Sequence, residues 1–309
     1  MSQERDLRLE SDERRRHRSL RLRRHGRRAY IRSVYSLPSL ATLGNAICGF
    51  GAIYVSVLQP SHSYADHWTT FFARFPFTIA AILIFVAMAF DGIDGRLARF
   101  TRHTTDFGGQ LDSLADMISF GVAPAFLALQ LFRVTAGDVP VFVSRAAWAT
   151  GALYMSCAAL RLARFNVSNE HGEQHHFSFL GLPSPGAAAV VASMVLLQKE
   201  LVKSGPPDSL EARLALVCVW FLPAIVLMAG LAMVSTFRYP HLINRYLRGK
   251  RSLGRVIAIL TLALLVIVAP IYTLAIGTFT YTLWGPVAWL WARSRPRPPQ
   301  PLPQTPAST

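Results

Sequence analysis

The chain has 309 residues, of which 52% are hydrophobic and only 16% are charged, and its formal net charge is +15. A soluble domain carries about a quarter charged residues, so this composition excludes an ordinary globular protein of the cytosol, and the apolar content excludes a disordered chain. Several apolar blocks reach about 18 residues or more, which is the length that spans a bilayer. The sequence therefore predicts a polytopic membrane protein.

Residues 1–36 form an arginine-rich arm. The arm holds twelve arginines against five acids, a net +7 of the chain's +15. It is either attracted to anionic lipid headgroups, at about 1 kcal/mol per basic residue, or a solvated tail that helps to set the topology. We do not expect a cleavable signal peptide, because no short apolar core with a small-residue cleavage site precedes the first span. No aromatic residue is interleaved before Tyr30, which argues against nucleic-acid binding.

Apolar segments follow in a regular order along the chain. We predict eight spans, at residues 39–58, 72–90, 111–132, 142–160, 179–197, 214–237, 256–272 and 273–291. Pro270 and Gly277 leave open whether the last two spans are separate helices or one kinked helix. The expected organisation is an arm of residues 1–36, a transmembrane domain of residues 37–292, and a Pro-rich, disordered tail of residues 293–309.

Basic residues gather in alternate loops between these spans. Three of those loops hold most of them: Arg96, Arg99 and Arg102; Arg161 and Arg164; and Arg238, Arg245, Arg248, Lys250, Arg251 and Arg255. The opposite loops hold fewer, namely Arg74, Arg133, Arg145, Lys199, Lys203 and Arg213. The positive-inside rule therefore places both termini in the cytoplasm.

Acidic residues are scarce in the membrane region, yet Asp91, Asp94, Asp106, Asp112 and Asp116 fall within the segment FDGIDGRLARFTRHTTDFGGQLDSLADMISFG. A charged group at membrane depth costs roughly 2.5 to 3.5 kcal/mol, so such a cluster needs compensation. On a helix, a spacing of three residues places Asp91 and Asp94 on one face. A spacing of four residues places Asp112 and Asp116 on one face as well. Four converging carboxylates need a counterion, and ligation by oxygen alone favours Mg²⁺, Mn²⁺ or Ca²⁺ over zinc.

The neighbours of the carboxylates indicate which chemistry the metal serves. Glycines allow close backbone approach and arginines supply donors for anionic oxygens; they are Gly92, Gly95, Gly108, Gly109, Arg96, Arg99 and Arg102. A metal-bridged pyrophosphate needs these arginines, whereas an ion pathway does not. A divalent-cation transporter using the same aspartates remains the alternative from a different class. An ordinary loop with helix caps accounts for Arg102 but not for four intramembrane carboxylates.

The run Asp91-x2-Asp94-Gly95-x2-Ala98-Arg99-x8-Gly108-x3-Asp112-x3-Asp116 resembles the motif of the CDP-alcohol phosphotransferases at every fixed position. The resemblance implies an enzyme that transfers a substituted phosphate group from a CDP-linked donor to an alcohol, with release of CMP. It implies an all-α membrane protein with a core of six transmembrane helices, to which about two C-terminal helices would be added here, and a homodimer. It further implies two Mg²⁺ or Mn²⁺ ions, held by Asp91, Asp94, Asp112 and Asp116.

The same resemblance implies roles for individual residues. Asp116 would be the general base that takes the proton of the attacking hydroxyl. Direct transfer is implied, although the sequence alone leaves a covalent phosphatidyl-enzyme open. The expected donor-binding residues are Thr42, Asn45, Gly95, Ala98, Arg99 and Gly108. Asn45 lies in an apolar span and needs a polar partner, which is either a neighbouring helix or the donor headgroup.

Further segments are similar to the integral-membrane phosphatidylserine synthases of bacteria and archaea. They are LPSLATLGN from Leu37, LDSLAD from Leu111 with SFGVAP from Ser119, RLARFN from Arg161, and FLGLPSP from Phe179. This similarity implies CDP-diacylglycerol as donor and L-serine as acceptor, with the active site on the cytoplasmic side of a bacterial-type cytoplasmic membrane. Glycerol 3-phosphate, inositol phosphate or another alcohol remain alternative acceptors.

The RLARFN segment also suits an acceptor site on chemical grounds. Arg161 and Arg164 lie one helical turn apart, and a guanidinium can bind the serine carboxylate through two hydrogen bonds. Asn166 offers both a donor and an acceptor, so we assign the role to Arg164 ahead of Arg161. The alternative for Arg161 is positive-inside anchoring. We interpret His171, His175 and His176 as part of a solvated loop, and the three cysteines as small core residues.

Overall fold

The structure is a computed structural model, and it describes residues 40–58, 67–101, 106–170, 178–206, 208–240 and 253–294. The arginine-rich arm, the three loop histidines and nearly all of the Pro-rich tail lie outside these residues, so the predictions for them stay predictions. The chain divides into two compact units, residues 1–127 and residues 128–309. The boundary falls inside one helix, α5 (Ala123–Thr135), and each unit is described by itself.

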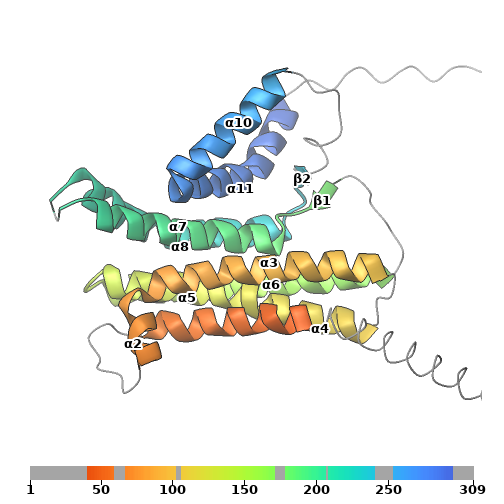
Figure 1. Ribbon diagram of the computed structural model, residues 1–309, viewed down its shortest axis with the longest axis horizontal. Helices are drawn as coiled ribbons and strands as arrows, with labels where there is room; N and C mark the ends of the chain where they lie inside the picture. The colour runs from red at the N-terminus through yellow and green to blue at the C-terminus, as the bar shows by residue number, and fades with distance from the viewer. Residues whose placement is uncertain are drawn as a thin grey trace, which may run out of the picture. The chain divides into compact units, whose positions relative to one another are not determined.

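The first unit is helical (Figure 1). It contains the helix Leu40–Val57, α2 (His67–Arg74), α3 (Pro76–Thr101), α4 (Asp106–Asp116), the π-helix η1 (Met117–Val122) and the start of α5. Proline is favoured at the first position of a helix, where its missing N–H is not needed, so Pro76 suits the start of α3. Helix α3 is apolar over its first four turns and carries Asp91 and Asp94 towards its end.

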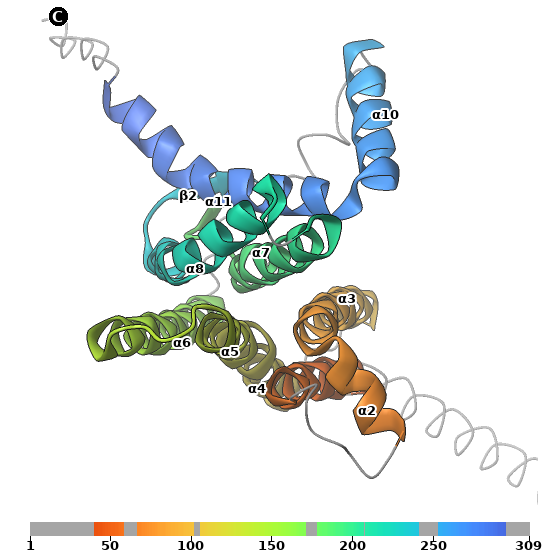
Figure 2. The same ribbon diagram turned by 90° about the vertical axis from the view of Figure 1, so that its left-hand side faces the viewer.

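The second unit contains the end of α5, followed by α6 (Val141–Glu170), β1 (Ser178–Leu180), α7 (Ser184–Ser204), α8 (Leu210–Val234), β2 (Arg238–Pro240), α10 (Leu253–Val268) and α11 (Pro270–Ser294). Helix α8 packs against both α6 and α7, and α11 packs across α7 and α8 (Figure 2). The strands β1 and β2 pair antiparallel, with Phe179 opposite Tyr239. They lie at the end of the α7–α8 pair where α7 begins (Figure 1).

The predicted class, a polytopic helical membrane protein, is confirmed. Within the described residues, five helices are long and apolar enough to cross a membrane: Leu40–Val57, Pro76–Leu97, Phe107–Thr135, Ser184–Ser204 and Leu210–Val234. The other three predicted spans are helices as well, namely α6, α10 and α11. The last two are separate, because Pro270 has no N–H to continue α10 and instead begins α11.

Several predicted boundaries are wrong, and the strand pair was not predicted. The second span, residues 72–90, starts inside α2, whereas α3 begins at Pro76, and the sixth, residues 214–237, runs past the end of α8 at Val234. The fifth span was placed at residues 179–197, but Phe179 lies in β1 and α7 begins only at Ser184. Gly181 adopts a φ of 82°, a left-handed conformation that favours glycine, and the chain turns there between β1 and α7. The Gly181 N–H donates to the Phe237 carbonyl oxygen at 2.8 Å, which extends the contact between the chain segments of β1 and β2.

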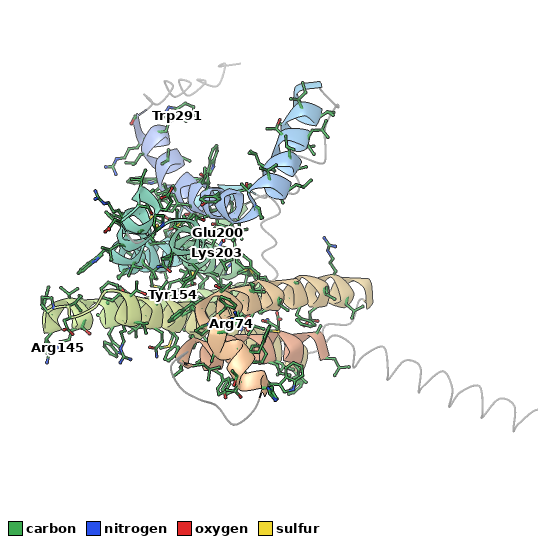
Figure 3. The ribbon with its side chains drawn as sticks, turned by 60° about the vertical axis from the view of Figure 1, so that its left-hand side comes forward. Arg74, Arg145, Tyr154, Glu200, Lys203 and Trp291 are labelled. Carbon is green, nitrogen blue, oxygen red and sulfur yellow. The ribbon has the colours of Figure 1, made fainter. Side chains whose placement is uncertain are left out.

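Small residues allow the helices of each unit to approach closely. In the second unit the fully buried Tyr154 of α6 lies against Gly230 of α8, where an added Cβ would be 3.1 Å from the Tyr154 Cα (Figure 3). Figure 3 also shows Arg145 near the start of α6, and Glu200 and Lys203 near the end of α7. Such small-residue contacts are the usual way in which helices associate inside a bilayer.

The closest approach in the first unit is between Gly49 and η1. A Cβ added at Gly49 would come 2.7 Å from the Ser119 Cα, which is backbone and cannot move aside. At Gly51, on the same helix, an added Cβ would meet only Leu83 Cδ1 at 3.5 Å, an ordinary van der Waals contact. Gly49 is therefore required by packing, whereas Gly51 is not.

We expect Gly49→Ala to lower the melting temperature of the purified protein in detergent. Overpacking at a close contact costs about 1 to 3 kcal/mol. Gly51→Ala is the matched control and should leave the melting temperature unchanged or raise it, since alanine favours a helix over glycine by about 1 kcal/mol. Equal melting temperatures for the two variants would contradict the close packing of this helix on η1.

Candidate active site

The aspartates of the predicted motif converge in the first unit. Asp91 lies in α3, whereas Asp112 and Asp116 lie in α4, and each of the three offers a carboxylate oxygen within 4.8 Å of the others. All three side chains are half-buried. Three carboxylates this close repel one another unless a cation lies among them, and hard oxygen ligands suit Mg²⁺ or Mn²⁺. The donor set therefore fits a divalent metal ion.

The fourth aspartate of the motif takes a different position. Asp94 is buried, with 6% of its surface exposed, and it accepts a hydrogen bond from the Thr42 hydroxyl. Its charge, like that of Asp91, acts on Asp112, so it belongs to the same electrostatic cluster. It is not among the three residues whose oxygens lie within 4.8 Å of one another.

Two residues that the sequence assigned to the donor contact the aspartates. Thr42 donates to Asp94, and the Asn45 amide nitrogen donates to Asp116 Oδ1 at 3.0 Å. Both side chains come from the helix Leu40–Val57 and are buried. A hydrogen bond to a carboxylate fixes the direction of its lone pairs, so this helix orients two of the four acidic groups. Asp116 of α4 is a neighbouring-helix partner of Asn45, and a contact of Asn45 with the donor headgroup stays a prediction.

The π-helix η1 begins directly after Asp116 and connects it to the same first helix. The Ser119 hydroxyl donates to the Asn45 carbonyl oxygen at 2.8 Å, and Gly49 leaves the space that this contact needs. π-Helical turns are rare and are found frequently at functional sites. Ser119 was not singled out as a site residue from the sequence, because an apolar run such as MISFGV predicts only a continuous helix.

The glycines of the motif border open space. Among the described residues, a Cβ added at Gly92, Gly95 or Gly109 would meet nothing within 4 Å. This agrees with the expectation that these glycines allow close approach of a ligand to the backbone. Ala98 and Arg99 continue α3, but their side chains, like those of Arg102 and Asp106, lie outside the described residues.

The predicted acceptor residues lie on α6 in the second unit. Arg161 is half-buried, and its Nη1 donates to the Ser184 hydroxyl at 2.7 Å. Asn166 is half-buried as well, whereas Arg164 is exposed. The structure therefore gives Arg161 a defined protein environment, whereas the sequence favours Arg164. In the sequence, Ser184 belongs to the FLGLPSP segment, and in the structure its contact with Arg161 joins α6 to the start of α7.

The fold and this site together define a helical membrane protein with an intramembrane carboxylate cluster suited to a divalent metal ion. The family model of the CDP-alcohol phosphatidyltransferases matches residues 35–232, which include the whole cluster. This chain belongs to the CDP-alcohol phosphatidyltransferase family.

Three relatives show where in the family the similarity lies. The chain is 33% identical to the CDP-diacylglycerol–serine O-phosphatidyltransferase of Helicobacter pylori, over 84% of this chain and 93% of the relative. It is 30% identical to the enzyme of the same name from Methanocaldococcus jannaschii, over 70% and 79% of the two chains. It is 31% identical to the archaetidylserine synthase of Methanothermobacter thermautotrophicus, over 68% and 72%.

Proposed function

We propose that this protein transfers the phosphatidyl group of CDP-diacylglycerol to the hydroxyl of L-serine, giving phosphatidylserine and CMP. The observation that carries the proposal is the convergence of Asp91, Asp112 and Asp116 from α3 and α4, in a chain of this family. The choice of serine rests on the relatives, whose names differ in the lipid but share serine as the alcohol.

Asp91, Asp94, Asp112 and Asp116 would hold the metal, which we propose to be two Mg²⁺ or Mn²⁺ ions. When bound, such ions neutralise the pyrophosphate of the donor and the phosphate of the departing CMP. Three of the four carboxylates already meet within 4.8 Å. Thr42 keeps the buried Asp94 carboxylate in a fixed direction. Gly95, Ala98, Arg99 and Gly108, from the predicted donor set, would lie along the CDP group.

Asp116 would act as the general base. It takes the proton from the serine hydroxyl while the serine oxygen forms a bond to the β-phosphorus of the donor. The bond between this phosphorus and the bridging oxygen breaks, and CMP leaves with the electron pair. Asn45 holds one Asp116 oxygen at 3.0 Å, which directs the remaining lone pairs of the carboxylate. The transfer is direct, without a covalent phosphatidyl-enzyme.

Arg161, Arg164 and Asn166 would bind the carboxylate and amino groups of serine. A guanidinium matches a carboxylate through two parallel hydrogen bonds, which lysine cannot reproduce. We further propose that the protein is a homodimer in a bacterial-type cytoplasmic membrane. Both termini and the active site would lie on the cytoplasmic side, a placement that the distribution of arginine in the loops supports.

The test is to incubate the purified protein with CDP-diacylglycerol, Mg²⁺ or Mn²⁺, and one alcohol at a time. We expect L-serine to give CMP and phosphatidylserine in equal amounts, and EDTA to stop both. Product from glycerol 3-phosphate or inositol phosphate instead of serine would change the assigned acceptor. Uptake of metal ions into proteoliposomes without release of CMP would support the transporter alternative.

A further inference from the structure

The side chain of Arg161 lies where three helices of the second unit meet. From α6 it reaches Ser184, the first residue of α7, whose side chain is 1% exposed and accepts its hydrogen bond at 2.7 Å. Helix α11 packs against the same helix α7. Helix α11 follows residue 232, where the match to the family model ends.

Tyr281 is held in place on the start of α7. A Cβ added at Gly186 would be 3.4 Å from Cε1 of Tyr281, so this ring lies against the first turn of α7, close to Ser184. On its other side Tyr281 packs against Tyr239, with ring centroids 5.5 Å apart. Tyr281 of α11 therefore lies at the same turn of α7 that Arg161 contacts, and Tyr239 of β2 supports it.

Tyr239 connects this arrangement to the strand pair. The Tyr239 hydroxyl donates to the Thr282 carbonyl of α11 at 3.0 Å, and its ring lies against Gly285. Burial raises the pKa of Tyr239 to about 12, with a smaller contribution from Tyr281, so the hydroxyl remains a donor at neutral pH. Tyr239 also pairs with Phe179 in β1, only five residues before Ser184. The strand pair thus joins the start of α7 to α11.

We propose that Tyr281, supported by Tyr239, is a positioning residue for the Arg161 guanidinium, which makes α11 part of the acceptor site. This inference rests on the proposed function, in which Arg161 binds the carboxylate of serine. The guanidinium is planar and carries its five N–H donors in a fixed fork, so contacts that hold one edge set the direction of the rest. Helix α11 would therefore influence the affinity for serine without touching the CDP-linked donor.

The test compares Tyr281→Phe with Tyr272→Phe in the full-length protein. Tyr281→Phe keeps the ring and its packing but removes the hydroxyl, whereas Tyr272 is an exposed tyrosine of the same helix. We expect Tyr281→Phe to raise the apparent KM for serine about threefold to tenfold, because its hydroxyl is the group proposed to hold the guanidinium, with the KM for CDP-diacylglycerol unchanged. Tyr272→Phe should match the wild type in both constants.

A double-mutant cycle with Arg161→Lys separates positioning from a general structural role. If Tyr281 acts through Arg161, Tyr281→Phe should raise the KM for serine much less in the Arg161→Lys background than in the wild type. Equal effects in both backgrounds, or an unchanged KM in Tyr281→Phe alone, would overturn the inference. An equal rise in both KM values, or a lowered melting temperature of Tyr281→Phe, would assign the residue to packing and also overturn it. Failure of the wild-type protein to use serine would refute the proposed function itself.

Discussion

Replacing Asp116 by asparagine is expected to abolish phosphatidyl transfer while donor binding survives at saturating metal. The substitution keeps the size of the side chain and removes the oxygen that takes the proton of serine. A general base contributes a factor of about 10² to 10⁴, so turnover should fall by that amount. Asp91 and Asp112 remain to hold at least one metal ion. Initial rates of CMP release, together with binding of CDP-diacylglycerol at saturating Mn²⁺, measure the two effects separately.

Asp138→Asn is the matched control for this variant. Asp138 lies in the exposed segment between α5 and α6, outside the carboxylate cluster, so its substitution should leave both turnover and donor binding unchanged. Turnover near the wild-type rate in Asp116→Asn would remove this residue from proton transfer and leave the metal ions as the main source of activation.

The convergence of the carboxylates could be predicted from the sequence because it depends on local geometry. Spacings of three and four residues fix which side chains share a helix face, and the short link between α3 and α4 brings the two faces together. The partners of the carboxylates could not be predicted in the same way. Thr42 and Asn45 precede Asp94 and Asp116 by 52 and 71 residues, so their hydrogen bonds depend on how the first helix packs in the folded chain.

The π-helix and the start of α7 show two different reasons for missing a feature. The run from Met117 to Val122 is apolar and predicts a helix, but its wide turn is observed where Ser119 meets Gly49, a contact that no local pattern encodes. Apolar content alone predicts a start of α7 that is too early in the chain. Gly181 and Pro183 mark the end of one segment and the start of another, and they would have placed the boundary correctly.

The environment of Arg161 required the fold. Its sequence context, RLARFN, predicts an anion-binding residue but favours Arg164, which lies close to Asn166. Ser184 follows Arg161 by 23 residues and lies at the start of another helix, where only the packing of α6 and α7 brings the two together. Tyr281 lies on a helix that the family motif does not include, so no spacing rule connects it to Arg161.

Replacing Asp91 by asparagine is expected to weaken metal and donor binding together, which distinguishes it from the Asp116 variant even if both are inactive. Asp91 is the one member of the three-carboxylate group contributed by α3, so without its charge only the two α4 carboxylates remain at this point. Fewer anionic ligands lower the affinity for a hard divalent ion, and a pyrophosphate held through that ion is lost with it.

Titration with Mn²⁺, followed by binding of CDP-diacylglycerol at saturating and at limiting Mn²⁺, measures both effects. High Mn²⁺ should restore part of the donor binding in Asp91→Asn, whereas no concentration of metal should restore turnover in Asp116→Asn. Wild-type Mn²⁺ affinity in Asp91→Asn would remove Asp91 from the residues that hold the metal.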